Sequence, residues 1–225
     1  MKLSVIIPVY NEKDTILKIL EKVKQVNVEK EIIVVDDGST DGTVDILQQI
    51  KDEKIKIILK EKNEGKGSAI REGLKYVTGD VIVIQDADLE YNPSDWIEML
   101  KFMEEKNAKV VFGSRILRKN KKASFFFYLG GRLLSLLANI LYNAKITDEP
   151  TCYKMFKKEV IENINLKSKK FEFCPEFTAK IRKKGYKIYE VPISYNPRSI
   201  KEGKKIRFKD GIHAIWTLIK YRFIE

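Results

Sequence analysis

Strand and helix patterns alternate regularly over the first 113 residues, and this alternation constrains the fold more than any other feature of the sequence. Short apolar runs typical of buried strands occur at residues 3–7, 32–35, 55–59, 81–84 and 110–112. Between them, apolar side chains recur at helical spacing, as in Ile16, Leu20 and Val23. Strands joined by helices need right-handed crossovers, so the pattern predicts an α/β fold with a mostly parallel sheet flanked by helices.

Polar segments follow several of these predicted strands. They read PVYNE at 8–12, DDGSTDG at 36–42, DADLE at 86–90 and GSR at 113–115. In a parallel sheet, ligands bind beyond the carboxyl ends of the strands, near the point where the strand order reverses. We therefore expect a polar ligand site at this edge of the sheet, and two of the four segments make it strongly acidic.

The acidic segment Asp86-Ala87-Asp88 follows a predicted buried strand. Two carboxylates separated by one residue at a strand end point the same way, and they repel each other unless a cation lies between them. Oxygen ligands suit Mg²⁺ or Mn²⁺, which also bridge to substrate phosphates. Glu90 is a candidate third ligand. Taken alone, a D-x-D segment also fits an ordinary surface loop.

Two further segments suit a nucleotide. Residues 8–12 offer an aromatic face and a carboxylate, as a nucleoside pocket would. Asp37 could accept hydrogen bonds from a base or ribose, although residues 36–41 could equally form a loop that caps the next helix. The sequence GKGS at 65–68 lacks the spacing of a P-loop, and its glycines are better explained by close approach of a loop to a helix.

Charge is unevenly distributed along the chain. Residues 1–116 hold 18 Lys/Arg and 22 Asp/Glu, whereas residues 117–225 hold 25 and 10. A basic half implies an anionic partner or a lysine-rich solvated surface. A nucleic-acid partner is disfavoured because the aromatic residues lie on apolar helical faces rather than among the basic loop. Only two cysteines occur, Cys152 and Cys174, so we expect a reducing compartment.

Two amphipathic helices are expected in the basic half. Residues 125–142 are strongly apolar, but Arg132 near the middle and polar residues at helical spacing argue against a membrane span. Residues 212–223 combine Trp216 and Phe223 with flanking cations. Such helices suit a membrane interface, and each could instead pack on the sheet. The apolar run at the N-terminus is too short for a signal peptide.

A cationic loop is expected at residues 198–207, which read RSIKEGKKIR. It is either a solvated basic loop or a lid that closes over a diphosphate and neutralises leaving-group charge. Arg115 is a further cation at a strand end.

Eight collinear segments resemble family 2 of the inverting glycosyltransferases. They are VIIPVYNE, VVDDGSTDGT, NEGKGSAIREG, QDADLEYNP, GSR, TDEPTCYKMF, FEFCPEF and YNPRSIKEGKKIRFKDG. The most similar branch is the polyprenyl-phosphate sugar transferases, among them the dolichol-phosphate mannose synthases. The resemblance implies a GT-A type, Rossmann-like sheet and one domain over residues 1–225. Residues 1–116 would bind the nucleotide-sugar, a UDP- or GDP-sugar, and residues 117–225 would face the acceptor and membrane.

The resemblance also assigns roles to individual residues. Pro8, Tyr10 and Glu12 would line the nucleoside pocket, with Val35 and Asp37 at the base or ribose and Ala87 at the nucleotide. Asp86 and Asp88 would hold Mg²⁺ or Mn²⁺ and the diphosphate, with Glu90 as third ligand, where related mannose synthases often have Gln. Arg115 would lie near the sugar or acceptor phosphate, and Arg198 and Lys204 would bind phosphate. Asp88, Arg115 and Arg198 are thus expected to be catalytic.

The acceptor decides whether a general base is needed. A lipid phosphate has a second pKa near 6, so it is already anionic at neutral pH. A hydroxyl acceptor on a soluble or cell-surface glycan, or on another lipid, would need a carboxylate base. Asp148 is then the best catalytic candidate and Glu149 the second, unless residues 147–150 simply form a turn. With a polyprenyl phosphate acceptor, we expect a cytoplasmic protein attached peripherally to the inner face of the cell membrane. The oligomeric state stays open.

Overall fold

The computed structural model describes residues 1–121, 124–199 and 203–224. Their strands form one seven-stranded sheet in the order β3-β2-β1-β4-β6-β5-β7. The strands are β1 (Leu3–Val9), β2 (Lys30–Asp36), β3 (Ile55–Leu59), β4 (Val81–Ile84), β5 (Val110–Ser114), β6 (Lys154–Lys157) and β7 (Ile188–Pro192). Only β6 runs antiparallel to its neighbours, so the predicted mostly parallel α/β sheet is confirmed.

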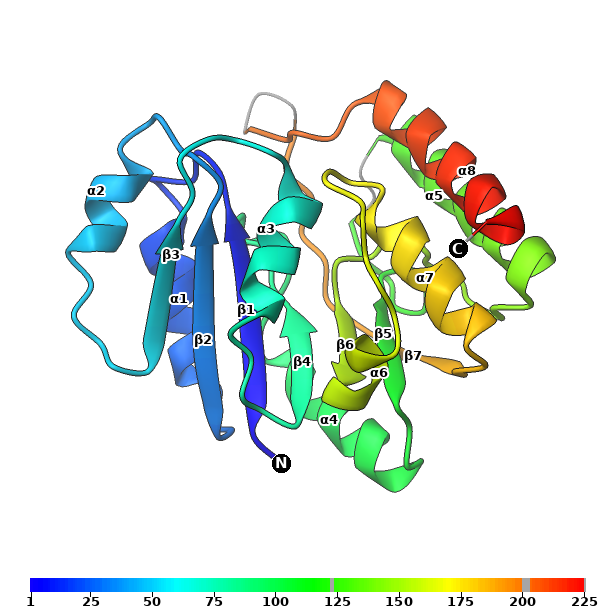
Figure 1. Ribbon diagram of the computed structural model, residues 1–225, viewed down its shortest axis with the longest axis horizontal. Coiled ribbons are helices and arrows are strands. Elements are labelled where there is room, and N and C mark those ends of the chain that lie inside the picture. The colour runs from blue at the N-terminus through cyan, green and yellow to red at the C-terminus, as the bar shows by residue number, and fades with distance from the viewer. Residues whose placement is uncertain (122–123, 200–202, 225) are drawn as a thin grey trace.

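Helices cover both faces of this sheet (Figure 1). They are α1 (Ile16–Gln25), α2 (Thr43–Gln48), α3 (Lys66–Leu74), α4 (Asp95–Glu105), α5 (Phe125–Tyr142), α6 (Lys158–Glu162), α7 (Phe173–Lys183) and α8 (Phe208–Phe223). Strands β1 and β4 are buried along their whole length, as expected for central parallel strands covered on both faces. Because β1 lies between β2 and β4, the strand order reverses beside it and opens a crevice at its carboxyl end.

Helices α5 and α8 lie side by side, away from β1 and β2 (Figure 1). In α5, the polar residues Ser135 and Asn139 turn inward. Ser135 Oγ accepts a hydrogen bond from the backbone N–H of Glu149, and Asn139 bonds both backbone groups of Ile146. The apolar side of α5 therefore faces outward. The residues of α5 and α8 that expose large apolar side chains are Phe125, Phe126, Leu129, Leu133, Leu136, Ile140, Phe208, Ile212, Trp216 and Phe223. We call these ten residues the apolar platform.

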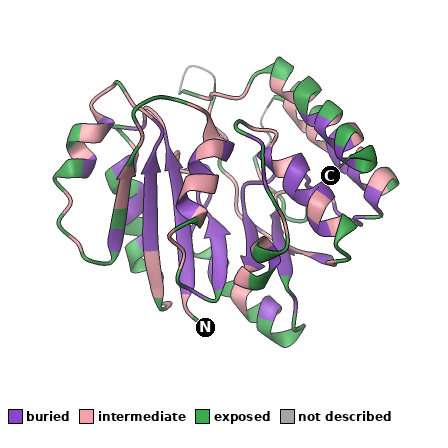
Figure 2. Cartoon of the chain, in the orientation of Figure 1, coloured by how far each residue is buried: buried purple, intermediate pink, exposed green. Residues whose placement is uncertain are grey.

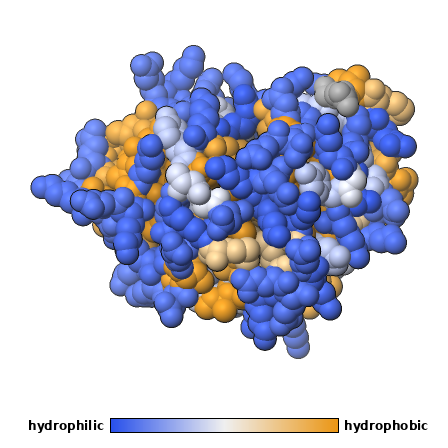
Figure 3. Space-filling model, turned by 60° about the horizontal axis from the view of Figure 1, so that its bottom comes forward, coloured by the Kyte–Doolittle hydropathy of each residue, from blue (hydrophilic) through white to orange (hydrophobic). Residues whose placement is uncertain are grey.

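The platform contrasts with other surfaces of the molecule. Figure 2 colours much of the outer side of α8 as exposed. The face near the amino ends of the strands is instead covered mainly by hydrophilic side chains, with small apolar groups between them (Figure 3). Among the described residues, α5 is the one helix long and apolar enough to cross a membrane, and 22% of it is buried in the protein.

A single carboxylate, that of Glu31, is hydrogen-bonded near the amino-terminal end of the sheet. Glu31 accepts hydrogen bonds from the hydroxyls of Ser4 and Thr78 and from the backbone N–H of Thr78. Burial alone would raise the pKa of Glu31, but these hydrogen bonds outweigh it and lower the pKa from 4.5 to about 2. The carboxylate therefore stabilises the fold only in its ionised form.

We expect Glu31→Gln to lower the free energy of unfolding at pH 7 by about 1–2 kcal/mol, after allowance for partial solvent exposure. The folded-state pKa is depressed, so the contribution is complete above pH 4.5 and disappears as the pH falls towards 2. Urea unfolding between pH 7 and pH 2 measures it, with exposed Glu29→Gln as control. Equal stability of both variants at pH 7 would contradict the expectation.

Candidate active site

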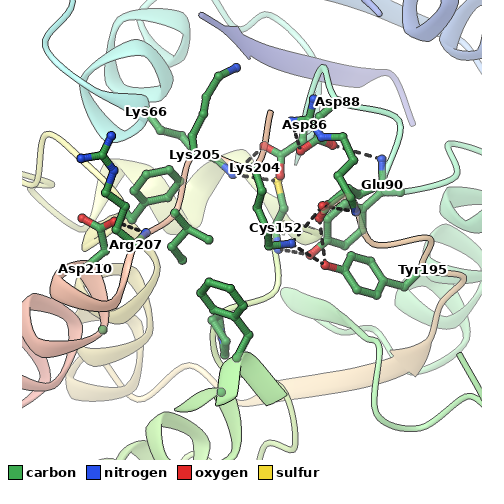
Figure 4. Close-up of a pocket in the computed structure, with 18 of the residues that line it drawn as sticks. Lys66, Asp86, Asp88, Glu90, Cys152, Tyr195, Lys204, Lys205, Arg207 and Asp210 are labelled. Atoms are coloured by element: carbon green, nitrogen blue, oxygen red, sulfur yellow. Dashed lines mark hydrogen bonds and ion pairs between the residues drawn. The ribbon is translucent and has the colours of Figure 1, made fainter. Parts of the chain in front are cut away.

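A cleft of about 2000 Å³ opens at the carboxyl ends of β1 and β4 and continues to α5 and α8 (Figure 4). Most of the predicted site residues line it, although they come from distant parts of the chain. They are Pro8, Tyr10, Glu12, Asp37, Asp86, Ala87, Asp88, Glu90, Arg115, Asp148, Arg198 and Lys204. The structure thus brings together the strand-end segments, the 147–150 turn and the cationic loop. Residues 200–202 of that predicted loop lie outside the described residues.

The side chain of Val35 does not reach the cleft, and the predicted contact of Val35 with the base or ribose stays a prediction. Val35 is fully buried and packs with Ile33 and Ala69, between the sheet and α3. Side chains alternate between the two faces of a strand, and Val35 points into the core. Asp37, just beyond β2, does line the cleft. Its carboxylate accepts hydrogen bonds from the Lys60 ammonium at 2.5 Å and from the backbone N–H of Gly65 at 2.6 Å.

Each carboxylate of the acidic segment 86–90 is paired with its own cation. Asp86 lies 2.5 Å from Lys66 Nζ, at the start of α3. Asp88 lies 3.0 Å from the Arg198 guanidinium, and Glu90 lies 3.0 Å from Lys204 Nζ. No group of three His, Cys, Asp or Glu side chains in the described parts of the chain is arranged to hold a metal ion. The three carboxylates of the predicted metal site are thus each engaged by a cation in this structure, and the role of Glu90 as third ligand stays a prediction.

The surroundings of Asp88 disfavour its ionised form. Burial raises the pKa of Asp88 to about 7, and repulsion from Asp86 and Glu90 adds to the shift, which Arg198 offsets only in part. The pKa of Asp86 is lowered, because attraction to Lys66 outweighs the opposing effect of burial. Two neighbouring, half-buried carboxylates that repel each other fit a hard divalent cation with oxygen ligands.

Arg198 joins the two sides of the cleft beside the acidic segment. Its guanidinium donates to both oxygens of Glu12, at 3.0 and 3.1 Å, as well as to Asp88. Lys205 Nζ also contacts Glu12, at 2.5 Å. Burial would raise the pKa of Glu12, but hydrogen bonds from Arg198 and Lys205 outweigh it and lower the pKa. Glu12 is therefore ionised and serves as the counter-ion of this cationic segment.

Arg115 and Asp148 form a buried pair deeper in the cleft. Asp148 is 2% exposed, and its two oxygens accept three hydrogen bonds from Arg115, at 2.7 to 2.8 Å. A carboxylate held in this way orients the guanidinium, and both of its oxygens are already engaged, which disfavours a base role for Asp148. Glu149 is fully buried and does not line the cleft. The residues 147–150 thus act as a turn that positions Arg115.

Sequence reasoning missed Tyr195 and did not place Lys66 beside Asp86. The Arg115 guanidinium lies over the Tyr195 ring, 5.0 Å from the centroid of that ring. The Tyr195 hydroxyl donates a hydrogen bond to Glu90 at 2.8 Å. Tyr195 begins the segment YNPRS, which offered a signal, but a tyrosine before a turn has no distinctive spacing. Lys66 and Asp86 are 20 positions apart, and no short-range pattern links them.

Gly65 and Gly67, at the start of α3, let the loop at residues 168–170 approach closely, as predicted. A Cβ atom on Gly67 would lie 2.7 Å from the carbonyl oxygen of Ser168. The backbone N–H groups of Gly67 and Ser68 donate to the carbonyls of Lys170 and Lys169. This contact fixes the start of α3, and with it Lys66 at the cleft.

We expect Gly67→Ala to lower the free energy of unfolding by about 1–3 kcal/mol, because the backbone of the 168–170 loop must move to admit the methyl group. Gly130→Ala on exposed α5 is the matched control. No atom lies within 4 Å of its added Cβ, and alanine there should stabilise the helix by up to about 1 kcal/mol. Chemical denaturation of both variants compares the two changes; destabilisation of similar size would contradict the close-packing explanation.

The fold and the cleft define the class of protein. The chain superimposes over its whole length on glucosyl-3-phosphoglycerate synthase of Mycobacterium tuberculosis, solved with Mn²⁺, UDP and glucosyl-3-phosphoglycerate. The TM-score is 0.73 at 18% identity, and 81% of that chain is covered. The protein therefore has the GT-A type fold of a glycosyltransferase.

The chain belongs to glycosyl transferase family 2, whose model matches residues 4–164. It is 30% identical over 213 residues to a dolichol-phosphate mannosyltransferase of Pyrococcus furiosus, covering 91% of this chain and 59% of that protein. It is 31% identical over 235 residues to an uncharacterized protein of Methanocaldococcus jannaschii, covering 98% of this chain and 99% of that protein. The chain thus spans well under two thirds of the mannosyltransferase.

Proposed function

We propose that this glycosyltransferase moves a sugar, with inversion at the anomeric carbon, from a UDP- or GDP-sugar to a polyprenyl phosphate. One observation carries the proposal: the cleft that holds the acidic segment continues without interruption to α5 and α8. Its far end is lined by Phe126, Leu129 and Leu133 of α5 and by Phe208 and Ile212 of α8. A single cavity therefore offers ionic contacts for a diphosphate and an apolar path for a lipid chain.

Mg²⁺ or Mn²⁺ is part of the proposal. Asp86 and Asp88 would hold the ion, and the repulsion between the two carboxylates, which contributes to the raised pKa of Asp88, supports this assignment. When bound, such an ion stabilises the charge that develops on a departing nucleoside diphosphate. The neighbour solved with UDP also contains Mn²⁺.

The chain's own residues supply the remaining charge stabilisation. Arg198 and Lys204 face the donor half of the cleft, where they would neutralise the diphosphate as the sugar leaves. Arg115, oriented by Asp148, would bind the acceptor phosphate. Because a lipid phosphate is already anionic at neutral pH, the reaction needs no carboxylate base, which agrees with the pairing of Asp148.

A soluble acceptor is the second candidate. The structural neighbour glucosyl-3-phosphoglycerate synthase, as its name says, acts on a small phosphorylated acid. Arg115 could bind the phosphate of a soluble acceptor in the same way as that of a lipid. The apolar platform favours the lipid, because a soluble acceptor gives no reason to expose ten large apolar side chains on two neighbouring helices.

We also propose that the platform attaches the protein peripherally to the inner, cytoplasmic face of the cell membrane. Cations flank it at Arg207, Lys209, Lys220 and Arg222. Apolar side chains bordered by Lys and Arg suit the headgroup region of an anionic bilayer, and the basic second half of the chain adds long-range attraction.

Liposome flotation tests this attachment. We expect the protein to float with vesicles of phosphatidylcholine and phosphatidylglycerol, and binding to weaken as salt is added. Trp216→Asp and Phe126→Asp, at 62% and 82% exposed positions, should each lower the partition coefficient about tenfold or more. Ile97→Asp, at a 51% exposed position on α4, is the control and should change little. Equal losses in all three variants, or no binding by the wild type, would contradict the proposal.

Donor binding is tested by a thermal-shift panel of UDP-, GDP- and dTDP-sugars with Mn²⁺. We expect a rise in melting temperature with one nucleotide, and no rise when Mn²⁺ is replaced by a chelator. A shift independent of the metal would remove the assigned role of Asp86 and Asp88.

A further inference from the structure

Strand β7 carries a carboxylate, Glu190, among apolar and aromatic neighbours. Side chains alternate between the two faces of a strand, so Glu190 lies opposite to Tyr189, whose ring packs against Phe102 of α4. In the sheet, Glu190 pairs with Phe112 of β5, and the Phe112 ring packs against Phe177 of α7. Glu190 therefore points to the face of the sheet that α7 covers, and it does not line the cleft.

Both oxygens of the Glu190 carboxylate hold the turn at residues 147–150. Oε2 accepts a hydrogen bond from the backbone N–H of Thr147 at 2.7 Å, and Oε1 accepts one from the backbone N–H of Asp148 at 3.0 Å. From the other side, Arg132 of α5 donates to the carbonyl oxygen of Thr147 at 3.0 Å. A turn offers few backbone partners of its own, so a carboxylate that accepts two consecutive N–H groups fixes its orientation.

The turn carries Asp148, whose side chain in turn holds Arg115. The Asp148 carboxylate accepts from Nε of Arg115 at 2.8 Å and from Nη2 at 2.7 Å. The guanidinium also lies over the rings of Tyr195 and Tyr91, at 5.0 and 6.0 Å from their centroids. Aromatic rings attract a guanidinium without fixing its rotation, whereas two hydrogen bonds from one carboxylate set its direction. The orientation of Arg115 therefore depends on where the turn places Asp148.

The charge of Glu190 does not explain its presence as a stabilising feature. Burial raises the pKa of Glu190, hydrogen bonds from Thr147 and Asp148 offset this only in part, and repulsion from the Asp148 carboxylate adds to the rise. Because the pKa is higher in the folded than in the unfolded state, the fold loses stability as the pH rises and Glu190 ionises. Glutamine has the same shape without the charge, so Glu190→Gln should leave the melting temperature nearly unchanged.

We propose that Glu190 is a positioning residue, which holds the backbone of the 147–150 turn so that Asp148 directs the Arg115 guanidinium into the cleft. Arg115 and Asp148 both line the cleft, and Glu190 acts on them from outside it. The inference rests on the proposed function for the ligand of Arg115, an acceptor phosphate. The anchoring of the turn does not depend on that assignment.

Hydrogen exchange, followed by nuclear magnetic resonance of the full chain, tests the anchoring. We expect Glu190→Ala to speed exchange about tenfold at the backbone amides of Thr147 and Asp148, which lose their acceptor. At the Nε–H of Arg115, which then lacks a fixed acceptor, we expect exchange to be about threefold faster or more. Glu190→Gln keeps one acceptor oxygen for two N–H groups, so its rates should lie between those of the wild type and the alanine variant.

Two further variants complete this comparison. Glu98→Ala, at an exposed position on α4, is the matched control and should change none of the three exchange rates. If Glu190→Ala does not fold, Glu190→Gln carries the same test, with smaller increases expected at the same three groups.

Steady-state kinetics separate positioning from a general loss of folded protein. The reaction contains Mn²⁺, a nucleotide-sugar and a short-chain polyprenyl phosphate. We expect Glu190→Ala to raise the KM for the polyprenyl phosphate about fivefold or more and to keep the KM for the nucleotide-sugar within about twofold, because Arg115 is assigned to the acceptor. Glu190→Gln should recover part of the acceptor KM. A purely structural role would reduce the amount of folded enzyme, which lowers kcat and leaves both KM values unchanged.

Three results would overturn the inference. The first is unchanged exchange at the amides of Thr147 and Asp148 in the Glu190 variants. The second is faster exchange at these amides with no change at the Arg115 Nε–H. The third is an acceptor KM that stays at the wild-type value. If the wild type transfers no sugar to a lipid phosphate, the proposed function fails, while hydrogen exchange still decides whether Glu190 positions Arg115.

Discussion

Replacing Asp88 by asparagine should lower the rate of sugar transfer by about 10³-fold or more, with the fold intact. The change keeps the shape of the side chain but removes a charge that faces both the diphosphate position and Arg198. Loss of charge stabilisation worth about 4 kcal/mol at the transition state corresponds to this factor. Steady-state transfer of a labelled sugar measures it.

The stability of this variant provides the first control. Burial and two neighbouring carboxylates disfavour the ionised form of Asp88 and raise its pKa, so an uncharged side chain should not weaken the fold. The melting temperature should therefore stay the same or rise. Asp45→Asn, an exposed isosteric change on α2, should leave the rate unaltered. A rate loss below about tenfold in Asp88→Asn would show that the acidic pair is not central to the reaction.

Replacing Arg115 by methionine should give the largest loss of stability. Its partner Asp148 is buried and would lose the two hydrogen bonds from the guanidinium, keeping only the one from the backbone N–H at position 115. Removing one member of a buried ion pair costs about 3–5 kcal/mol, because the other charge is left without compensation. Urea unfolding at pH 7 measures the effect.

A second substitution, at Asp148, shows whether the loss of stability comes from the unpaired charge of that residue. In the Arg115→Met background, Asp148→Asn removes the stranded charge and should recover part of the lost stability. Sugar transfer should not recover, because Arg115 itself is assigned to the acceptor phosphate. Equal stability of the single and double variants would mean that the charge of Asp148 is not what the guanidinium compensates.

The sheet and the location of the site were predictable because they depend on local patterns. Apolar runs of four to seven residues mark β1 and β4, and the polar segments that follow them fall at the carboxyl edge. Asp86 and Asp88 were identified for the same reason. The order of strands beyond β4, with β6 inserted antiparallel between β4 and β5, has no such local signal.

The partners of the site residues were not predictable, since they are set by tertiary structure. Asp88 pairs with Arg198 and Glu90 with Lys204, across more than 100 positions of sequence. Glu90 is a candidate third ligand because its spacing from Asp88 allows it, but its contacts with Tyr195, Arg198 and Lys204 cannot be read from spacing. Asp148 looked like a base until Arg115 was found on both of its oxygens.

Helix α5 illustrates the same limit. Its two faces were recognised from periodicity, but periodicity does not tell which face meets the protein. Polar Ser135 and Asn139 satisfy backbone groups of the 146–149 turn, so they point inward. Leu134, Ala138 and Tyr142 pack inward as well, and the other large apolar side chains that stay exposed form the platform.

The most direct test of the proposed function offers two acceptors in one reaction. The protein is incubated with Mn²⁺, a labelled UDP- or GDP-sugar, a short-chain polyprenyl phosphate in detergent, and 3-phosphoglycerate. We expect the label to enter the organic phase as a lipid-linked sugar, and to do so less in Arg115→Lys, which cannot reproduce the bidentate contact with Asp148. Label on 3-phosphoglycerate with the lipid unlabelled would contradict the account.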